Sequence, residues 1–176
     1  MMIGRNRFNI YLLLSLAAAF GVGCLTLNKP DKQMSTLRVH LEANPDESSY
    51  TTSVPIYREK PVSITVDKIP FLTELDVSEA KVIDVMGGFE LSIKFNKHGS
   101  WLLEGYSTGN LGKHFAVFSQ FGKTAKESRW LAAPTFSRRI TNGGMIFTPD
   151  ATREEAERIV LGLNNVAKKA KEADKW

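Results

Sequence analysis

Apolar and polar residues alternate along several short segments of this chain, which is the spacing of β-strands with one buried face. The alternating apolar positions are Leu37, Val39 and Leu41, then Val62, Ile64 and Val66, then Phe89, Leu91, Ile93 and Phe95. Gly87 and Gly88 separate the last run from Val82, Ile83 and Val85, so the pattern predicts a β-hairpin there. Residues 43–53 are rich in Asn, Pro, Asp and Ser, which predicts a loop.

The pattern continues as strands after residue 114. Residues 115–121 are mostly apolar and a polar insert, residues 122–128, follows them. The segment 130–136 is also apolar but contains Pro134, which has no N–H to donate to a sheet, so it predicts an edge strand or a bulge. Asn142-Gly143-Gly144 predicts a turn into a last short strand at residues 145–147.

Helical spacing occurs in two segments. Asn96 is placed to cap a helix through Leu102, Leu103 and Tyr106. Thr152 and Glu155 form a capping box for a second helix. Its apolar stripe consists of Ala156, Ile159, Val160, Leu163, Val166, Ala167 and Ala170. The sequence therefore predicts an α+β fold, an antiparallel or mixed sheet with two helices packed on one face.

The N-terminal segment has the pattern of a secretory signal peptide. Arg5 and Arg7 precede 13 apolar or small residues, 10–22, and Gly23-Cys24 follows. The lone cysteine directly after a small residue indicates lipid attachment at Cys24. We expect a signal peptide at residues 1–23, a lipid-anchored tether at residues 24–35 and one folded domain at residues 36–172.

Two alternatives for this segment stay open. Residues 10–22 span about 20 Å as a helix, short of the roughly 30 Å hydrocarbon core, but an uncleaved anchor that extends to Leu27 reaches it. The second alternative is ordinary cleavage of the signal peptide without acylation of Cys24. Under all three, the domain lies in the cell envelope and faces the periplasm or the extracellular side.

Charge gives little indication of a partner. Removal of residues 1–23 takes away Arg5 and Arg7 but no acid, which leaves 21 basic residues against 19 acidic ones. The cations are dispersed, so we expect no nucleic-acid partner.

The residues offer little catalytic chemistry. Gly105-Tyr106-Ser107-Thr108-Gly109 matches the G-x-S-x-G pattern of serine hydrolases, but that motif requires a strand before the serine and an acid before a later histidine. Here a predicted helix surrounds Ser107 and only His114 follows, with no acid between them. We therefore interpret Ser107 as a helix-surface hydroxyl and keep a hydrolase as a remote alternative.

Histidines and aromatic residues were the remaining candidates for a site. His40, His98 and His114 lack metal-ligand spacing, so we expect no metal, no cofactor and no enzymatic activity. Large aromatic residues usually pack in a core. On the predicted edge strand, however, Trp130 and Phe136 are candidates for exposure and for contact with an extended polypeptide.

Motifs in a consistent order resemble the first periplasmic (head) domain of the SecD family, which assists protein export. They are Leu37–Glu42, Leu75–Ala80, Phe89–Phe95, Gly99, Leu103, Asn110–Lys113, Phe115–Val117, Ala133-Pro134, Ile140–Gly144, Phe147-Thr148, Glu154–Ala156 and Leu163. Together they cover most of residues 36–168. The resemblance implies a compact α+β binding module and supplies no active-site residues.

These observations lead to one functional hypothesis and one main rival. The chain is expected to be an envelope lipoprotein, held to the membrane through Cys24, that binds an extended polypeptide or an envelope protein as an accessory in protein export or envelope maintenance. The rival is a structural or assembly role unrelated to export. The partner's identity and the oligomeric state stay open.

Overall fold

The computed structural model describes residues 33–45, 49–122 and 126–173. The chain divides into two units, residues 1–31 and 32–176, and every described residue belongs to the second. The predicted signal peptide, Cys24 and residues 24–32 of the predicted tether lie outside the described residues.

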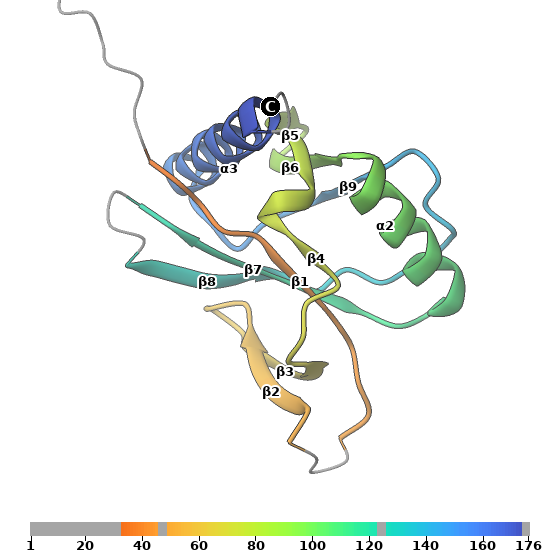
Figure 1. Cartoon of the computed structure of the whole chain (residues 1–176). Coiled ribbons are helices and arrows are strands. Elements are labelled where there is room, and N and C mark those ends of the chain that lie inside the picture. The colour runs from red at the N-terminus through yellow and green to blue at the C-terminus, as the bar shows by residue number, and fades with distance from the viewer. Residues whose placement is uncertain (1–32, 46–48, 123–125, 174–176) are drawn as a thin grey trace, which may run out of the picture. The chain divides into compact units, whose positions relative to one another are not determined.

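The described strands form three antiparallel sheets (Figure 1). The four-stranded sheet has the order β4-β1-β7-β8, a two-stranded sheet pairs β2 with β3, and a three-stranded sheet has the order β5-β6-β9. The elements are β1 (Arg38–Leu41), β2 (Thr51–Ile56), β3 (Val62–Asp67), β4 (Leu72–Thr73), the 3-10 helix η2 (Glu74–Asp76), β5 (Val77–Val85), β6 (Gly88–Phe95), α2 (Lys97–Gly109), β7 (Phe115–Phe121), β8 (Glu127–Ala132), β9 (Gly144–Phe147) and α3 (Arg153–Ala173).

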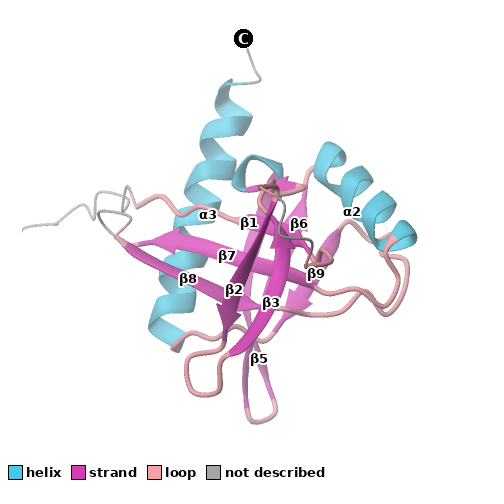
Figure 2. Ribbon diagram, turned by 90° about the horizontal axis from the view of Figure 1, so that it is seen from below, coloured by secondary structure: helices cyan, strands magenta, loops and turns pink. Residues whose placement is uncertain are grey.

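The four-stranded sheet separates two layers. Helices α2 and α3 and the three-stranded sheet lie on one side of it, and the β2–β3 hairpin lies on the other (Figures 1 and 2). The α+β fold with both helices on one side of a sheet is therefore confirmed. Among the described residues, no helix combines the length and the hydropathy needed to cross a bilayer.

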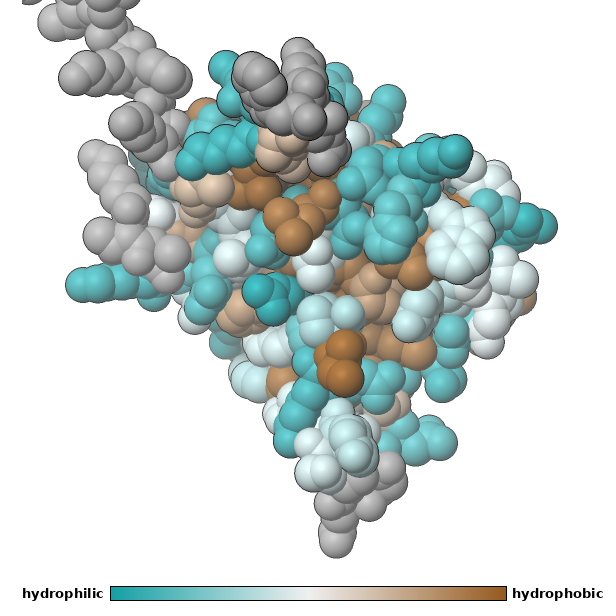
Figure 3. Space-filling view, viewed as in Figure 1, coloured by the Kyte–Doolittle hydropathy of each residue, from teal (hydrophilic) through white to brown (hydrophobic). Residues whose placement is uncertain are grey.

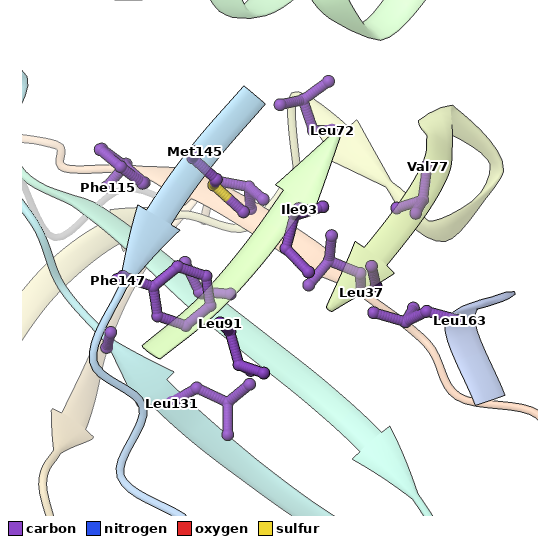
Figure 4. Close-up of a cluster of buried hydrophobic side chains, with 14 of the residues drawn as sticks. Leu37, Leu72, Val77, Leu91, Ile93, Phe115, Leu131, Met145, Phe147 and Leu163 are labelled. Carbon is purple, nitrogen blue, oxygen red and sulfur yellow. The ribbon is translucent and has the colours of Figure 1, made fainter. Parts of the chain in front are cut away.

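The main core lies between the four-stranded sheet, the three-stranded sheet and the helices. Leu37, directly before β1, and Leu131 of β8 pack with Leu91 and Ile93 of β6, and Leu163 of α3 joins them (Figure 4). Each fully buried side chain of this size stabilises the fold by about 1.5–3 kcal/mol. A smaller cluster under the β2–β3 hairpin consists of Val54, Ile56, Val66 and Ala116.

The predicted hairpin and the two predicted helix starts are confirmed. Strands β5 and β6 pair from Val77↔Phe95 to Val85↔Gly88, and Gly87 adopts a positive φ of 87° in the turn. At α2, the Asn96 side chain accepts a hydrogen bond from the Gly99 N–H at 2.9 Å. At α3, Thr152 Oγ1 accepts from the Glu155 N–H at 3.2 Å, while a Glu155 carboxylate oxygen accepts from the Thr152 N–H at 2.7 Å.

Helix α3 covers part of the outer edge of β5. The Ala80 N–H donates to Asn164 Oδ1 at 2.8 Å, and Asn164 Nδ2 donates to the Ala80 carbonyl at 2.9 Å. One amide side chain thus takes the place of a neighbouring strand at this position, so the backbone groups of Ala80 stay satisfied.

Two predicted boundaries need correction. Strand β2 begins at Thr51, inside the predicted loop 43–53, because its partner β3 pairs with it from Thr51↔Asp67 onward. The predicted tether extended to residue 35, but Gln33 and Ser35 are buried against α3, where the Gln33 side chain donates to the Arg158 carbonyl at 2.9 Å. The folded region therefore includes residues 33–35.

Candidate functional site

The two aromatic residues predicted for partner contact have different environments. The expectation that Phe136 is exposed is wrong: its side chain is 1% exposed and stacks on Phe115, with ring centroids 4.4 Å apart. Backbone hydrogen bonds of 2.9 Å hold this segment against the chain after α2, from Phe136 N–H to the Lys113 carbonyl and from Gly112 N–H to the Phe136 carbonyl. Phe136 is a core residue, whereas Trp130 is partly buried and borders a hollow.

The Trp130 hollow has a volume of about 260 Å³ and lies on the four-stranded sheet. Its lining residues come from alternate positions of neighbouring strands and of the residues before β1: Thr36, Arg38, His40, Phe118, Gln120 and Trp130. The intervening residues, such as Val39 and Val117, point to the opposite face and lie in the main core. The β2–β3 hairpin packs on the same face through Val54, Ile56 and Val66, and Trp130 packs against that cluster, so the hollow lies beside the hairpin.

Three rings line the Trp130 hollow. The Trp130 ring lies 5.1 Å from Phe118 at 54° and 5.3 Å from His40 at 65°, measured between ring centroids. Such tilted and edge-on arrangements are favourable for aromatic pairs. They hold the three rings in fixed orientations relative to one another.

The polar part of the hollow contains His40 and Arg38. The His40 Nδ1–H donates to the Asp67 carbonyl at 2.7 Å. Burial lowers the pKa of His40, the hydrogen bond to Asp67 opposes that effect and the positive charge of Arg38 adds to it. His40 is therefore neutral at pH 7. Arg38 is exposed and lies 3.7 Å from Glu74.

The sequence predicts an edge strand at residues 130–136; the edge strand is β8, Glu127–Ala132, which begins inside the predicted polar insert and ends before Pro134, and part of its edge is covered. It ends the order β4-β1-β7-β8, and the register with β7 shifts at Val117/Phe118. The Leu131 carbonyl accepts a hydrogen bond from the Asp150 N–H at 2.7 Å, and Arg129 donates to the Asp150 carbonyl at 3.3 Å. Strand addition along the C-terminal half of β8 would have to displace Asp150, so the hollow beside Trp130 is the more accessible surface.

Ser107 is not the surface hydroxyl that the sequence suggested. It is fully buried, its Oγ donates to the Glu104 carbonyl at 3.1 Å, and it accepts from the Ile140 N–H at 2.9 Å. The hydroxyl thus ties α2 to the segment before β9, and a buried hydroxyl with these bonds is badly placed to attack a substrate.

The three histidines bind to separate partners. His40 binds Asp67, His98 Nδ1 lies 2.8 Å from Asp76, and His114 Nδ1 lies 3.0 Å from Glu42. No group of three or more His, Cys, Asp or Glu residues in the described ranges is arranged to hold a metal ion.

An exposed tryptophan, Trp101, lies on α2. Its side chain is 72% exposed and borders a separate hollow with Leu102, Gly105, Tyr106 and Asn110. Figure 3 shows apolar side chains gathered between β4 and α2 on this side of the domain. Trp101 provides a matched control for Trp130.

Sequence reasoning found Trp130 but missed the other residues of its hollow. The available signal was the alternation in β1 and β7: once Leu37, Val39 and Val117 are assigned to the core, Arg38, His40 and Phe118 must share the opposite face. Which strands are neighbours decides whether these residues meet, and that pairing joins segments about 80 residues apart.

The comparisons with known proteins point to one system. No family model matches this chain. The protein translocase subunit SecD of Rhodobacter capsulatus is 28% identical over 99 residues, which cover 56% of this chain and 17% of that protein. This chain therefore matches less than a fifth of its curated relative.

Two solved structures are similar in fold. SecDF described as a membrane component that enhances protein export superposes with a TM-score of 0.52 at 19% identity, covering 93% of this chain and 70% of that one. SecDF in a super-membrane-facing form gives a TM-score of 0.52 at 20% identity, covering 76% of this chain and 19% of that one. The domain formed by the described residues has a SecD-head-like α+β fold.

Proposed function

We propose that this chain is an envelope lipoprotein whose SecD-head-like domain binds extended polypeptide as a non-enzymatic accessory in protein export or envelope maintenance. The similarity to SecD and SecDF supports a link to export, since one of those structures is described as enhancing it. The Trp130 hollow carries the binding part of the proposal, because it combines three rings with polar groups on an open sheet face.

The hollow suits a polypeptide that has not folded. An apolar side chain of such a segment would enter between Trp130 and Phe118, where it loses contact with water. Arg38 and Gln120, which border the same hollow, offer donors for the backbone carbonyls beside that side chain. Contacts of this kind depend little on sequence, which suits an accessory that meets many clients.

The first prediction concerns Trp130. The full chain is purified in detergent, and its affinity for an unfolded model polypeptide, reduced and carboxymethylated α-lactalbumin, is measured by fluorescence anisotropy. We expect Trp130→Ala to weaken binding roughly tenfold, because truncation of a central aromatic anchor costs more than about 1 kcal/mol. Trp101→Ala removes an exposed ring on α2 and should leave the affinity within about twofold.

Two results would contradict the proposal. Equal affinities for wild type and Trp130→Ala would exclude the hollow as the binding surface. Equal losses in both tryptophan variants would indicate non-specific adhesion to exposed rings. Near-ultraviolet circular dichroism of each variant verifies that the domain is folded before the affinities are compared.

A further inference from the structure

Another hollow lies along the free edge of β9. It has a volume of about 510 Å³ and is bordered on one side by β9 and on the other by the segment from Pro134 to Asn142. Phe115, Ile140 and Met145 supply apolar surface inside it. We call this hollow the β9 groove.

The backbone of β9 faces the groove at alternate residues. The Phe95 N–H donates to the Gly143 carbonyl at 2.9 Å, and the pairs Ile93↔Met145 and Leu91↔Phe147 follow in the same register. In an antiparallel ladder, hydrogen-bonded and non-hydrogen-bonded pairs alternate. The backbone groups of Gly144 and Ile146 therefore point away from β6, toward the groove.

The opposite side of the groove carries positive charge. Its lining includes Arg138 and Arg139 and no acidic residue. Arg139 forms an ion pair with Glu104, so its charge is partly neutralised. Arg138 is exposed on the same segment and can reach an incoming carboxylate. The groove thus presents strand-edge backbone groups on one side and a guanidinium on the other.

We propose that the β9 groove binds an extended acidic segment of a partner protein, which adds to the three-stranded sheet as a neighbour of β9. The partner's backbone bonds with Ile146, and its carboxylates face Arg138. Backbone pairing supplies affinity in strand addition, and the charges select the segment. This site shares no lining residue with the Trp130 hollow and pairs with the backbone of an acidic segment instead of receiving an apolar side chain, and it does not depend on a role in export.

The test uses the full chain and three labelled eight-residue peptides in fluorescence anisotropy. One alternates Glu with Val, one alternates Lys with Val, and the third is the Glu peptide with N-methyl groups on the N–H groups of one edge. We expect the Glu peptide to bind at least tenfold more tightly than the other two, because the Lys peptide lacks the charge match and the methylated one lacks the backbone donors.

Variants locate the binding. Arg138→Glu should weaken binding of the Glu peptide at least tenfold. Lys169→Glu makes the same charge change at an exposed position on α3 and should change that affinity less than twofold. Ile146→Pro removes one N–H that faces the groove and none that faces β6, and should weaken binding where Ile146→Ala does not. If the proline variant does not fold, the methylated peptide tests the same hydrogen bonds.

Several outcomes would overturn this proposal. They are equal binding of the Glu and Lys peptides, equal effects of Arg138→Glu and Lys169→Glu, and undiminished binding of the methylated peptide. If Trp130→Ala weakens binding of the Glu peptide and Arg138→Glu does not, the peptide binds in the Trp130 hollow and not in the β9 groove. Because α-lactalbumin binding tests that hollow separately, either proposal can fail while the other stands.

Discussion

Glu155 is the side chain with the largest number of strong contacts at the start of α3. The Arg129 guanidinium donates to its carboxylate at 2.6 and 2.9 Å, and the Thr152 N–H donates to it at 2.7 Å. The hydrogen bonds from Arg129 are the main cause that lowers the pKa of Glu155 from 4.5 to about 2. The ionised form is therefore bound more tightly in the folded protein than in the unfolded chain.

This difference predicts a pH dependence of stability. The pKa of Glu155 is depressed in the folded state, so its contribution is present above pH 4.5 and is lost as the pH falls toward 2. By pH 3 the loss is at most about 2 kcal/mol, less where solvent screens the pair. Urea unfolding at pH 7 and pH 3 measures it.

A matched pair of variants isolates this group. Glu155→Gln should be less stable than wild type at pH 7 and lose less stability between pH 7 and pH 3. Glu157→Gln changes an exposed carboxylate on the same helix and should keep the wild-type slope. If Glu155→Gln loses as much stability as the wild type between pH 7 and pH 3, other carboxyl groups cause the pH dependence.

At the level of single residues, sequence reasoning was wrong about the exposure of Phe136, whereas Trp130 borders a hollow and its contact with a partner stays a prediction. Both are aromatic residues near Pro134, and an edge strand can expose either. Phe136 is buried because the residues after α2 fold back onto its backbone, at Lys113 and Gly112, and bring Phe115 under its ring. No local sequence pattern predicts a contact between segments that lie more than 20 residues apart.

At the level of elements, hairpins and helix caps were the most predictable features. Asn96, Thr152 and Glu155 act within their own turn, so the sequence alone determines the bonds they can form. The start of β2 was missed because the loop predicted from the Asn, Pro, Asp and Ser residues of 44–49 was extended to residue 53. Strand β2 also contains Pro55, which is tolerated because β2 pairs only with β3 and has a free edge.

Helix α3 packs closely against residues 33–35 at Gly162. A Cβ on Gly162 would lie 2.5 Å from the Ser35 nitrogen and 2.7 Å from Ser35 Cβ, both shorter than van der Waals contact allows. Gly105 on α2 is the reverse case, since a Cβ there meets nothing within 4 Å. Replacement by alanine should therefore lower the stability of the domain at Gly162 and raise it at Gly105.

We expect Gly162→Ala to destabilise the domain by about 1–3 kcal/mol, as overpacking does, and Gly105→Ala to stabilise it by about 0.4–1 kcal/mol. Thermal unfolding monitored by circular dichroism measures both. If Gly162→Ala is as stable as Gly105→Ala, residues 33–35 are not packed against α3 and the predicted tether boundary at residue 35 would stand.

At the level of the whole molecule, the proposed anchor decides where binding takes place. Mass spectrometry of the wild-type chain from the membrane pellet of fractionated cells should find a mature N-terminus at Cys24 that carries an acyl mass, and Cys24→Ser should abolish that mass. A wild-type chain that keeps residues 1–23 and carries no acyl mass would favour an uncleaved anchor. A soluble wild-type chain would favour ordinary cleavage, and both results contradict the lipoprotein proposal.

The Asn164 amide, which holds both backbone groups of Ala80, has a mechanical consequence. A displacement of α3 along β5 by one residue would break both hydrogen bonds together and expose a buried donor and acceptor, each at a cost of about 1–3 kcal/mol. Sliding of α3 along β5 is therefore opposed by both hydrogen bonds at once.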